Sequence, residues 1–280
     1  MEDGIIWWQE LPYHISPNIF TIGAFQLRYY GLMYLAAFFV TYALVSHRLK
    51  REAFSYSIET IQDFFLWGIA GLIIGARLGY ILFYNPGYYL CHPLETVLPF
   101  DFSQGMNFVG ISGMSYHGGA LGIIVAAFIF CRKRRINFWD LADLFCPAFP
   151  LGYTFGRIGN FINGELFGRP TTVFWGMFFP LSPGRELRHP SQLYEAFFEG
   201  IALFLILWSL RKKRPFTGFH LALYIIGYGL IRFFIEFYRE PDFHLGFIWN
   251  TLSMGQVLCI IMVLAGIGII IRGQAKRPQG

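Results

Sequence analysis

The stretch TLSMGQVLCIIMVLAGIGIII, residues 251–271, decides the fold class of this chain, and it contains no acidic or basic side chain. An α-helix needs about 20 mostly apolar residues to cross the hydrocarbon core of a bilayer. The stretch has the length and the apolar character for that. We therefore predict that it forms a transmembrane helix.

Six earlier stretches are similar, although Pro147 and Pro150 lie inside one of them. Proline normally ends a helix, but a packed membrane bundle can satisfy the carbonyls that it frees. We keep that stretch as one span. The sequence thus predicts an all-α, polytopic membrane protein that forms a single integral membrane domain over residues 1–280. Its seven predicted spans cover about residues 29–46, 64–84, 114–131, 138–156, 193–210, 217–238 and 251–271.

The composition supports a membrane protein. Hydrophobic residues make up 55% of the 280 residues and charged residues only 14%, against about 25% charged in a typical soluble domain. This balance excludes a disordered chain, and four cysteines are too few for a small disulfide scaffold. The net charge of +5 does not indicate nucleic-acid binding, because the basic residues form short clusters between apolar runs. The acidic start, Glu2 and Asp3, argues against a cleavable signal peptide.

The positions of the basic residues predict the orientation. Fourteen of them, including all five lysines, lie after spans one, three, five and seven. Lysine and arginine accumulate on the cytoplasmic side of membrane proteins. We therefore expect the N-terminus outside and the C-terminus in the cytoplasm. The other eight are arginines in the outer half of a span or in an outer loop: Arg28, Arg77, Arg157, Arg169, Arg185, Arg188, Arg232 and Arg239.

These outer arginines suit an anionic lipid head group. The planar guanidinium meets a phosphate with two parallel hydrogen bonds, whereas lysine acts as a point charge. Arg77, Arg157 and Arg232 lie within or at the ends of apolar runs, where ionisable groups are costly and mark functional sites. Arg185 and Arg188 fit solvated loop residues or structural ion pairs at least as well.

Six of the seven spans carry a polar group toward the outer side, and we expect these groups to form a pocket near the outer interface. Arg232, Glu236 and Arg239 are spaced i, i+4, i+7, which places them on one helical face. An ion-pair network that locks the bundle is the alternative. It explains Arg232 with Glu236 but not an excess of arginines over carboxylates. The full set is Arg28, Tyr30, Arg77, His117, Arg157, Glu195, Arg232 and Glu236.

The densest polar stretch is GRIGNFINGELFGRP, residues 156–170. Four glycines in thirteen residues allow the backbone to approach a ligand and to adopt unusual dihedral angles. Two asparagines, two arginines and a glutamate add hydrogen-bonding capacity. The stretch predicts an anion-binding loop where the fourth span meets the interface.

Continued by one residue to GRIGNFINGELFGRPT, this stretch closely resembles the signature of the prolipoprotein diacylglyceryl transferase family. The loop at about 85–113, which carries Cys91 and His92, is longer than the resemblance suggests, and Phe167 stands where an indole is frequent. Six further motifs of the family occur along the chain in the family's order, three before this stretch and three after it. They are LRYYGLMY (27–34), GARLGY (75–80), SYHGG (115–119), RHPSQLYEA (188–196), RFFIEFYREPD (232–242) and SMGQ (253–256).

The resemblance implies a multi-pass transferase of the bacterial cytoplasmic (inner) membrane, with its active site toward the outer face. A small extracytoplasmic head would come from about residues 160–191. The implied reaction moves the sn-1,2-diacylglyceryl group of phosphatidylglycerol to the thiol of the lipobox cysteine of a prolipoprotein. It forms a thioether, releases glycerol phosphate and is the first step of bacterial lipoprotein maturation. The implied partners are these two substrates and the bilayer, and no metal or cofactor is implied.

The resemblance also implies roles for single residues. Arg157 and Arg232 would bind the phosphate, and Arg77 is a further candidate for substrate binding. His117 is the obvious general base by chemistry, because imidazole titrates near neutrality. A structural role for His117 remains open, since an arginine-rich pocket can also lower the pKa of a thiol. Glu236 and Arg239 would orient and balance the two phosphate-binding arginines. Tyr30, Asn160, Glu165 and Gly168 match other functional positions of the family.

Other functions are an anionic-lipid transporter or flippase, and a structural scaffold. A transporter is expected to show internal repeats and polar residues near the membrane midplane, and the sequence shows neither. A scaffold would not need buried arginines.

Asp140 and Asp143 have a magnesium-like spacing, but we place them at a helix start, where acidic residues are favourable. The cysteines are expected to be inert, because the reacting thiol belongs to the substrate.

Overall fold

The computed structural model describes residues 2–22, 25–83, 86–96, 100–101, 107–108, 113–240, 247–248 and 252–275. These residues are mostly helical, with three two-stranded antiparallel hairpins that the sequence did not lead us to expect. The chain forms two compact units, which are described separately. Unit 1 comprises residues 1–53 and 142–280, and unit 2 comprises residues 54–141.

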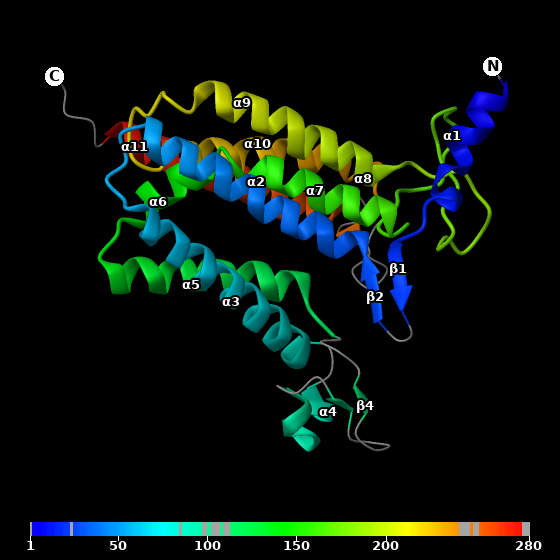
Figure 1. Ribbon diagram of the computed structural model, residues 1–280. Helices are drawn as coiled ribbons and strands as arrows, with labels where there is room; N and C mark the ends of the chain where they lie inside the picture. Colours follow the sequence, from blue (N-terminus) through cyan, green and yellow to red (C-terminus); the bar gives the residue numbers. More distant parts are fainter. Residues whose placement is uncertain are drawn as a thin grey trace. The chain divides into compact units, whose positions relative to one another are not determined.

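Unit 1 contains most of the helices (Figure 1). Its N-terminal part holds α1 (Glu2–His14), the hairpin β1 (Asn18–Ile22) with β2 (Phe25–Arg28), and α2 (Tyr29–Arg51). Helix α6 (Phe138–Phe145) crosses the boundary between the units. Then follow α7 (Phe149–Ile162), α8 (Ser191–Tyr194), η2 (Glu195–Ala202), α9 (Leu203–Leu210), α10 (Phe219–Ile235), the hairpin β5 (Phe247–Ile248) with β6 (Leu252–Ser253), and α11 (Met254–Ala275).

Four helical stretches of the described chain are long and apolar enough to cross a membrane: Tyr29–Arg51, Ile58–Phe83, Ser191–Leu210 and Met254–Ala275. They coincide with the first, second, fifth and seventh predicted spans. Helix α10 is apolar but shorter. The membrane class is therefore supported, while seven spans and their orientation stay predictions.

The fourth predicted span is not one helix, because the chain turns at residues 146–148 between α6 and α7. Pro147 has no N–H to donate to the carbonyl of Asp143, and the N–H of Ala148 bonds to Phe145 instead of Leu144. The two freed carbonyls accept hydrogen bonds from Nη1 of Arg48, at 2.7 and 2.6 Å. Arg48 is one of the basic residues that follow the first predicted span, and it is fully buried in this role.

The carboxylate of Asp143 caps the N-terminus of α10. It accepts hydrogen bonds from the backbone N–H groups of Gly218 at 2.7 Å, His220 at 2.8 Å and Leu221 at 3.2 Å. These groups have no partner within α10, and a carboxylate at a helix N-terminus satisfies them. Asp143 therefore caps α10, the helix that carries Arg232.

Close backbone packing brings the helices of unit 1 together. Helix α2 lies beside α7, α7 beside η2, and α10 beside α11. Small residues allow this approach, as is usual between membrane helices. A Cβ atom on Gly152 of α7 would meet Oγ1 of Thr41, and one on Gly200 of η2 would meet Oγ1 of Thr154.

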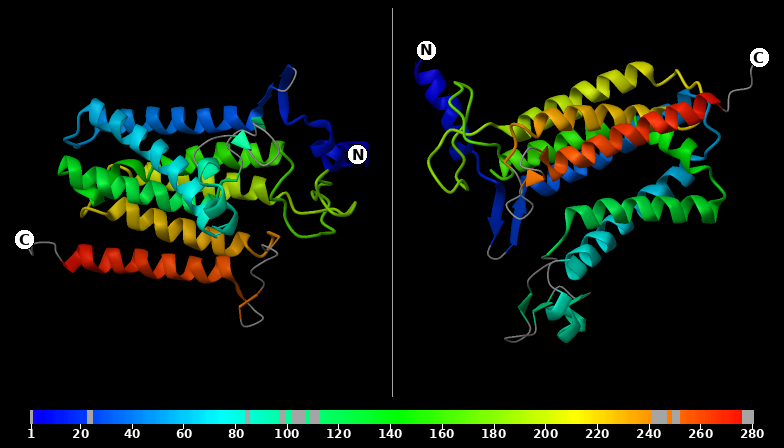
Figure 2. Two further views of the ribbon diagram at one scale, coloured as in Figure 1. Left: turned by 90° about the horizontal axis from the view of Figure 1, so that it is seen from below. Right: turned by 180° about the vertical axis from the view of Figure 1, so that it is seen from behind.

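The two ends of unit 1 differ. Helix α1, the β1–β2 hairpin and the irregular segment 163–190 lie at one end of the helices, and the end of α11 lies at the other (Figure 2). Met177 and Phe179 of this segment form a small core with Phe161 of α7, and Leu11 and Ile15 pack against it. Bridges join Pro170 and Met177 to Arg188.

Unit 2 consists of α3 (Ile58–Phe83), α4 (Pro86–Cys91), η1 (Pro93–Thr96), the strands β3 (Phe100–Asp101) and β4 (Asn107–Phe108), and α5 (Tyr116–Arg134). Glycines line the contact between α3 and α5. A Cβ on Gly75 would lie 2.6 Å from Cα of Gly122, so any larger residue would push the helices apart. Arg134 forms an ion pair with Asp63.

Candidate functional site

Unit 1 buries a cluster of five charged side chains, which we call the charged cluster. It takes one residue from α7, two from η2 and two from the end of α10. Charged groups at such depth are retained only where they are paired, and they mark functional sites. The members are Arg157, Glu195, Glu199, Arg232 and Glu236.

One carboxylate oxygen lies between the two arginines. Oε2 of Glu195 is 2.7 Å from Nε of Arg157 and 3.3 Å from Nη1 of Arg232. Glu195 is fully buried, while 12% of the Arg157 side chain is exposed. The arrangement shows that the two guanidinium groups are close enough to share a single anionic oxygen.

Glu199 and Tyr153 complete this part of the cluster. Nη1 of Arg232 lies 3.6 Å from Oε1 of Glu199. The hydroxyl of Tyr153 donates to Glu199, accepts from Nε of Arg157 at 2.6 Å and lies 3.2 Å from Glu195. The helix has the wider π form from Glu195 to Ala202, and such turns are frequent at functional sites.

A chain of hydrogen bonds leads from Arg157 into the segment after α7. Nη1 of Arg157 donates to Oδ1 of Asn160 at 3.2 Å, and Nδ2 of Asn160 donates to Glu165 at 2.8 Å. Arg157 and Asn160 lie on the last turns of α7, so only the later half of the predicted anion-binding loop is a loop. Tyr30 of α2 lies alongside, since a Cβ on Gly159 would be 3.0 Å from its ring.

The segment of Glu165 is fixed by side chains from α8. Gln192 donates to the carbonyl of Glu165 at 2.7 Å, and Ser191 donates to the carbonyl of Leu166 at 3.0 Å. Leu166 has φ 57°, in the left-handed region that costs energy for a residue with a side chain. These two bonds hold the strained turn beside the charged cluster.

Glu236 joins the cluster to the start of α11. Its Oε2 lies 2.9 Å from Nη2 of Arg232, and its Oε1 accepts from Ser253 at 3.0 Å. The Ser253 N–H donates to Oε1 of Gln256, and the Gln256 N–H donates to Oγ of Ser253. Thus the SMGQ motif supports the carboxylate that pairs with Arg232.

Arg239 is not on the helical face that we predicted for it, because α10 ends at Ile235. The chain turns there, and the backbone of Arg239 forms a β-bridge with Gly168. A side chain at Gly168 would meet the carbonyl of Tyr238 and Cβ of His189. Gly168 is therefore needed for close contact between two backbones. Arg169 strengthens the junction through its Nε, which donates to the carbonyl of Arg239 at 2.8 Å.

The charged cluster holds three carboxylates and two arginines, which reverses the excess of arginines inferred from the sequence. Glu199 was overlooked, and other outer arginines lie elsewhere. Arg188 pairs with Glu240 at 2.7 Å, and the exposed Arg185 pairs with Glu10 at 2.9 Å. An ion-pair network is thus present, and any role in binding must use groups that this network already orients.

The cluster keeps hydrogen-bonding capacity. Within the cluster, Oε1 of Glu195 is buried and has no hydrogen-bond partner among the described residues. Three other buried atoms of the cluster are held by ion pairs without a hydrogen bond: Oε1 of Glu199, Oε2 of Glu236 and Nη1 of Arg232. Buried polar atoms in native proteins are normally satisfied. Ionised carboxylate oxygens only accept hydrogen bonds, so a phosphate oxygen at this cluster would be bound by the guanidinium groups of the two arginines.

Two predicted site residues belong to unit 2. Arg77, in the second half of α3, donates to the carbonyl oxygens of Thr96 at 3.0 Å, Gly113 at 3.3 Å and Glu95. His117 is the second residue of α5, and its side chain lies outside the described residues. The charged cluster is thus built from unit 1 alone, and these two residues are described within unit 2.

Comparison with known proteins adds a family to this geometry. Residues 17–272 match the sequence model of the family described as prolipoprotein diacylglyceryl transferase. The chain is 52% identical to a phosphatidylglycerol–prolipoprotein diacylglyceryl transferase of Chlorobaculum tepidum, over 97% of this chain and 94% of the relative. It is 46% identical to the protein of that name in Campylobacter hominis, over 95% and 93%. The chain belongs to the prolipoprotein diacylglyceryl transferase family.

Sequence reasoning missed two residues of the site in this family member. Glu199 lies in an apolar run, four residues after Glu195. Two carboxylates at i, i+4 spacing within a predicted span are unusual, and this spacing could have indicated that Glu199 belongs to the site. Tyr153 is four residues before Arg157, and its ring lies under the guanidinium, 4.7 Å from Cζ to the centroid. Nothing separates this tyrosine from the other aromatic residues of the chain at the sequence level.

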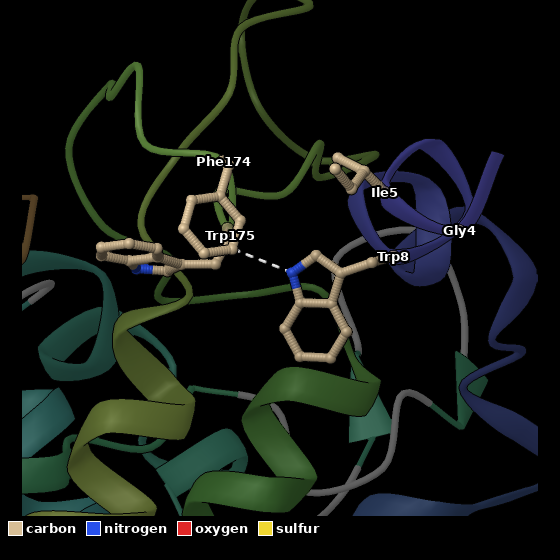
Figure 3. Close-up of a pocket in the computed structure, with 5 residues that line it drawn as sticks. All are labelled: Gly4, Ile5, Trp8, Phe174 and Trp175. Atoms are coloured by element: carbon tan, nitrogen blue, oxygen red, sulfur yellow. Dashed lines mark hydrogen bonds between the residues drawn. The ribbon is translucent and has the colours of Figure 1, made fainter. Parts of the chain in front are cut away.

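A hollow lies away from the charged cluster, at the contact between α1 and the irregular segment. Gly4, Ile5, Trp8, Phe174 and Trp175 line it, and the indole N–H of Trp8 donates to the carbonyl of Trp175 at 3.0 Å (Figure 3). It has no titratable side chain among these residues. The charged cluster, and not this hollow, is therefore the candidate site for the chemistry of this transferase family member.

Proposed function

We propose that this protein transfers the sn-1,2-diacylglyceryl group from phosphatidylglycerol to the thiol of the lipobox cysteine of a prolipoprotein. The product is a thioether and the leaving group is glycerol phosphate. The family and the names of its relatives support this activity. The observation that carries the proposal is that the largely buried Arg157 and the buried Arg232 share one carboxylate oxygen.

The reaction needs the phosphate charge to be held. A carbon–oxygen bond between the diacylglyceryl group and the phosphate breaks, a carbon–sulfur bond forms, and the phosphate leaves with the bonding electrons. Preorganised arginines in a water-poor site stabilise that charge without reorganisation. In the proposal, Arg157 and Arg232 bind the phosphate, while Glu195, Glu199 and Glu236 keep their guanidinium groups in place.

The other site residues shape the pocket. We propose that Asn160 and Glu165 orient Arg157 through their hydrogen bonds, and that Tyr30 lines the same side. Gly168 and Arg239 join the loop to the end of α10. Their part in catalysis is thus to fix the geometry around the phosphate.

The thiol must lose its proton before it can attack, and we propose His117 as the base. Replacement His117→Gln should then remove most turnover while phosphatidylglycerol still binds. Raised pH should restore part of the rate, because more thiolate forms without the base. A variant with near-normal turnover at neutral pH would leave the arginine pocket as the activating group.

The proposed setting is the bacterial cytoplasmic (inner) membrane. We propose seven spans in one membrane domain, with the N-terminus outside, an outer head at about residues 160–191 and the charged cluster toward the outer face. The irregular segment and the most basic helix ends support this orientation, because they lie at opposite ends of the unit 1 helices.

The experiment that tests the function uses purified protein in nanodiscs, phosphatidylglycerol labelled in its glycerol head group, and a lipobox peptide. We expect release of glycerol phosphate and an equal amount of thioether peptide. A peptide with serine in place of cysteine should give neither product. Movement of lipid between leaflets without any product would instead identify a transporter.

A further inference from the structure

Arg77 donates hydrogen bonds to backbone carbonyls of η1 and of Gly113, which lies shortly before α5. Its Nε donates to the carbonyl of Thr96 at 3.0 Å, its Nη1 to that of Gly113 at 3.3 Å, and its Nη2 to that of Glu95. Its Cζ lies 5.1 Å from the centre of the Tyr89 ring. One guanidinium therefore joins α3 to α4, η1 and the residues before α5.

Gly113, whose carbonyl Arg77 binds, is followed closely by the first turn of α5. The N–H of Ser115 donates to the carbonyl of Ala76 at 2.9 Å, next to Arg77 itself. Oγ of Ser115 accepts from the N–H of Gly118 at 3.2 Å and caps the helix. Gly113, Ser115 and Gly118 thus fix the backbone on both sides of His117.

Tight packing makes this backbone position sensitive to the segment before it. Gly113 has φ 73°, and a Cβ there would lie 2.7 Å from Cδ1 of Tyr80. A Cβ on Gly118 would be 2.9 Å from Cα of Gly79. The first turn of α5 therefore has little room to shift against α3, and the Gly113 carbonyl that Arg77 holds determines where the chain enters it.

We propose that Arg77 is a positioning residue: it clamps the segment that leads into α5, thereby sets the place of His117, and does not bind the lipid. The effect on turnover rests on the proposed function, in which His117 takes the thiol proton. Only a guanidinium presents several N–H donors in a fixed plane to three carbonyls. Lysine at this position would keep the charge and lose most of the clamp.

The test compares the full-length protein with its Arg77→Lys variant in nanodiscs. We expect amide hydrogen exchange at residues 113–119 to rise by tenfold or more in phosphatidylcholine nanodiscs. With phosphatidylglycerol present, kcat should fall about tenfold while KM for this lipid stays within about twofold. Arg134→Lys is the control, because Arg134 lies in the same unit and its side chain is 57% exposed; both quantities should be unchanged.

Other outcomes would overturn the clamp. A KM for phosphatidylglycerol raised tenfold with unchanged exchange would make Arg77 a lipid ligand, and unchanged kcat and exchange would make it dispensable. If Arg77→Lys does not accumulate, Ser115→Ala decides: it should raise the same exchange and lower kcat in smaller measure, and wild-type values would refute the proposal. A wild-type protein without transferase activity would refute the proposed function, while the exchange data would still test the clamp.

Discussion

The guanidinium of Arg157 makes three contacts, two through Nε and one through Nη1. It donates to Tyr153, pairs with Glu195 and donates to Asn160. If the lipid phosphate binds here, Arg157→Lys keeps the charge but loses the planar fork. A hydrogen bond to a charged group is worth about 1.5–3 kcal/mol, and tenfold in rate is about 1.4 kcal/mol. Turnover with phosphatidylglycerol should therefore fall by about tenfold to a hundredfold.

Arg185→Lys is the matched control for this prediction. The Arg185 side chain is 73% exposed and forms an ion pair with Glu10, and exposed pairs contribute little. Kinetics with the labelled lipid should thus separate the two variants. Full activity of Arg157→Lys would exclude two-bond phosphate recognition there and would make Arg232 the leading candidate.

Arg48 gives a second prediction, because it is fully buried and has no proposed part in catalysis. It pairs with Glu52 at 2.6 Å and holds the carbonyls that the proline break frees. Removing one partner of a buried ion pair costs about 3–5 kcal/mol. We expect Arg48→Ala to lower the free energy of unfolding by that amount in a detergent titration.

The control for Arg48→Ala is a substitution at the end of the same helix. Arg51 is exposed, and an exposed substitution usually changes stability by no more than about 0.5 kcal/mol. Arg51→Ala should therefore unfold like the wild type. Equal stability of the two variants would show that the carbonyls at the proline break need no arginine.

The sequence was informative about single residues where the cost of burying charge is high. Arg157 and Arg232 stood out in apolar runs, and the structure places both in the charged cluster. Arg48 and Arg188 did not stand out, because a basic residue near a helix end is normally solvated. Whether such a residue is buried depends on the partners that the fold brings to it, and those lie about 50 to 160 residues away along the chain.

At the scale of elements, the contact of α7 with η2 depends on the absence of a side chain at Gly200. A Cβ there would meet Oγ1 of Thr154 and come within 3.1 Å of its Cβ. Added volume in a packed interior costs about 1–3 kcal/mol, so Gly200→Ala should lower stability by that amount. Arg157 and Glu195 lie on these two elements, and activity should fall as well.

A double-mutant cycle tests whether Thr154 causes that loss. Gly200→Ala combined with Thr154→Ala should be more stable than the sum of the single effects predicts, because neighbouring sites are not additive. Gly68→Ala is the control, since no atom lies within 4 Å of its Cβ position, and it should be neutral or slightly stabilising. Additive effects in the cycle would place the strain elsewhere.

The sequence predicted elements well where length and hydrophobicity decide. The long helices coincide with the predicted runs, because an apolar stretch of such length has few other structures. At Pro147 the prediction was right in one part and wrong in the other. The freed carbonyls are satisfied within the bundle, by Arg48 of α2, but the predicted span is divided into α6 and α7 by a turn. The short hairpins and the π form of η2 had no signal, since both depend on contacts made after the helices pack.

At the scale of the whole molecule, the orientation of the chain is the prediction on which the placement of the site depends. Fourteen lysine and arginine residues fall on one predicted side, and Cys91 falls in an outer loop. Cys91 is exposed, while Cys131, Cys146 and Cys259 are buried. In right-side-out vesicles, a membrane-impermeant maleimide should therefore label the native protein at Cys91 alone.

Engineered cysteines then test both faces in a Cys91→Ser background. Arg185→Cys should react in right-side-out vesicles, because the proposed head lies outside. Arg134→Cys and Lys213→Cys should react only in inverted vesicles, because transferring their basic clusters across the membrane is unfavourable. All three side chains are exposed, so a missing reaction reports the side of the membrane and not burial. Labelling of Arg134→Cys from outside would reverse the topology and would place the charged cluster away from the outer face.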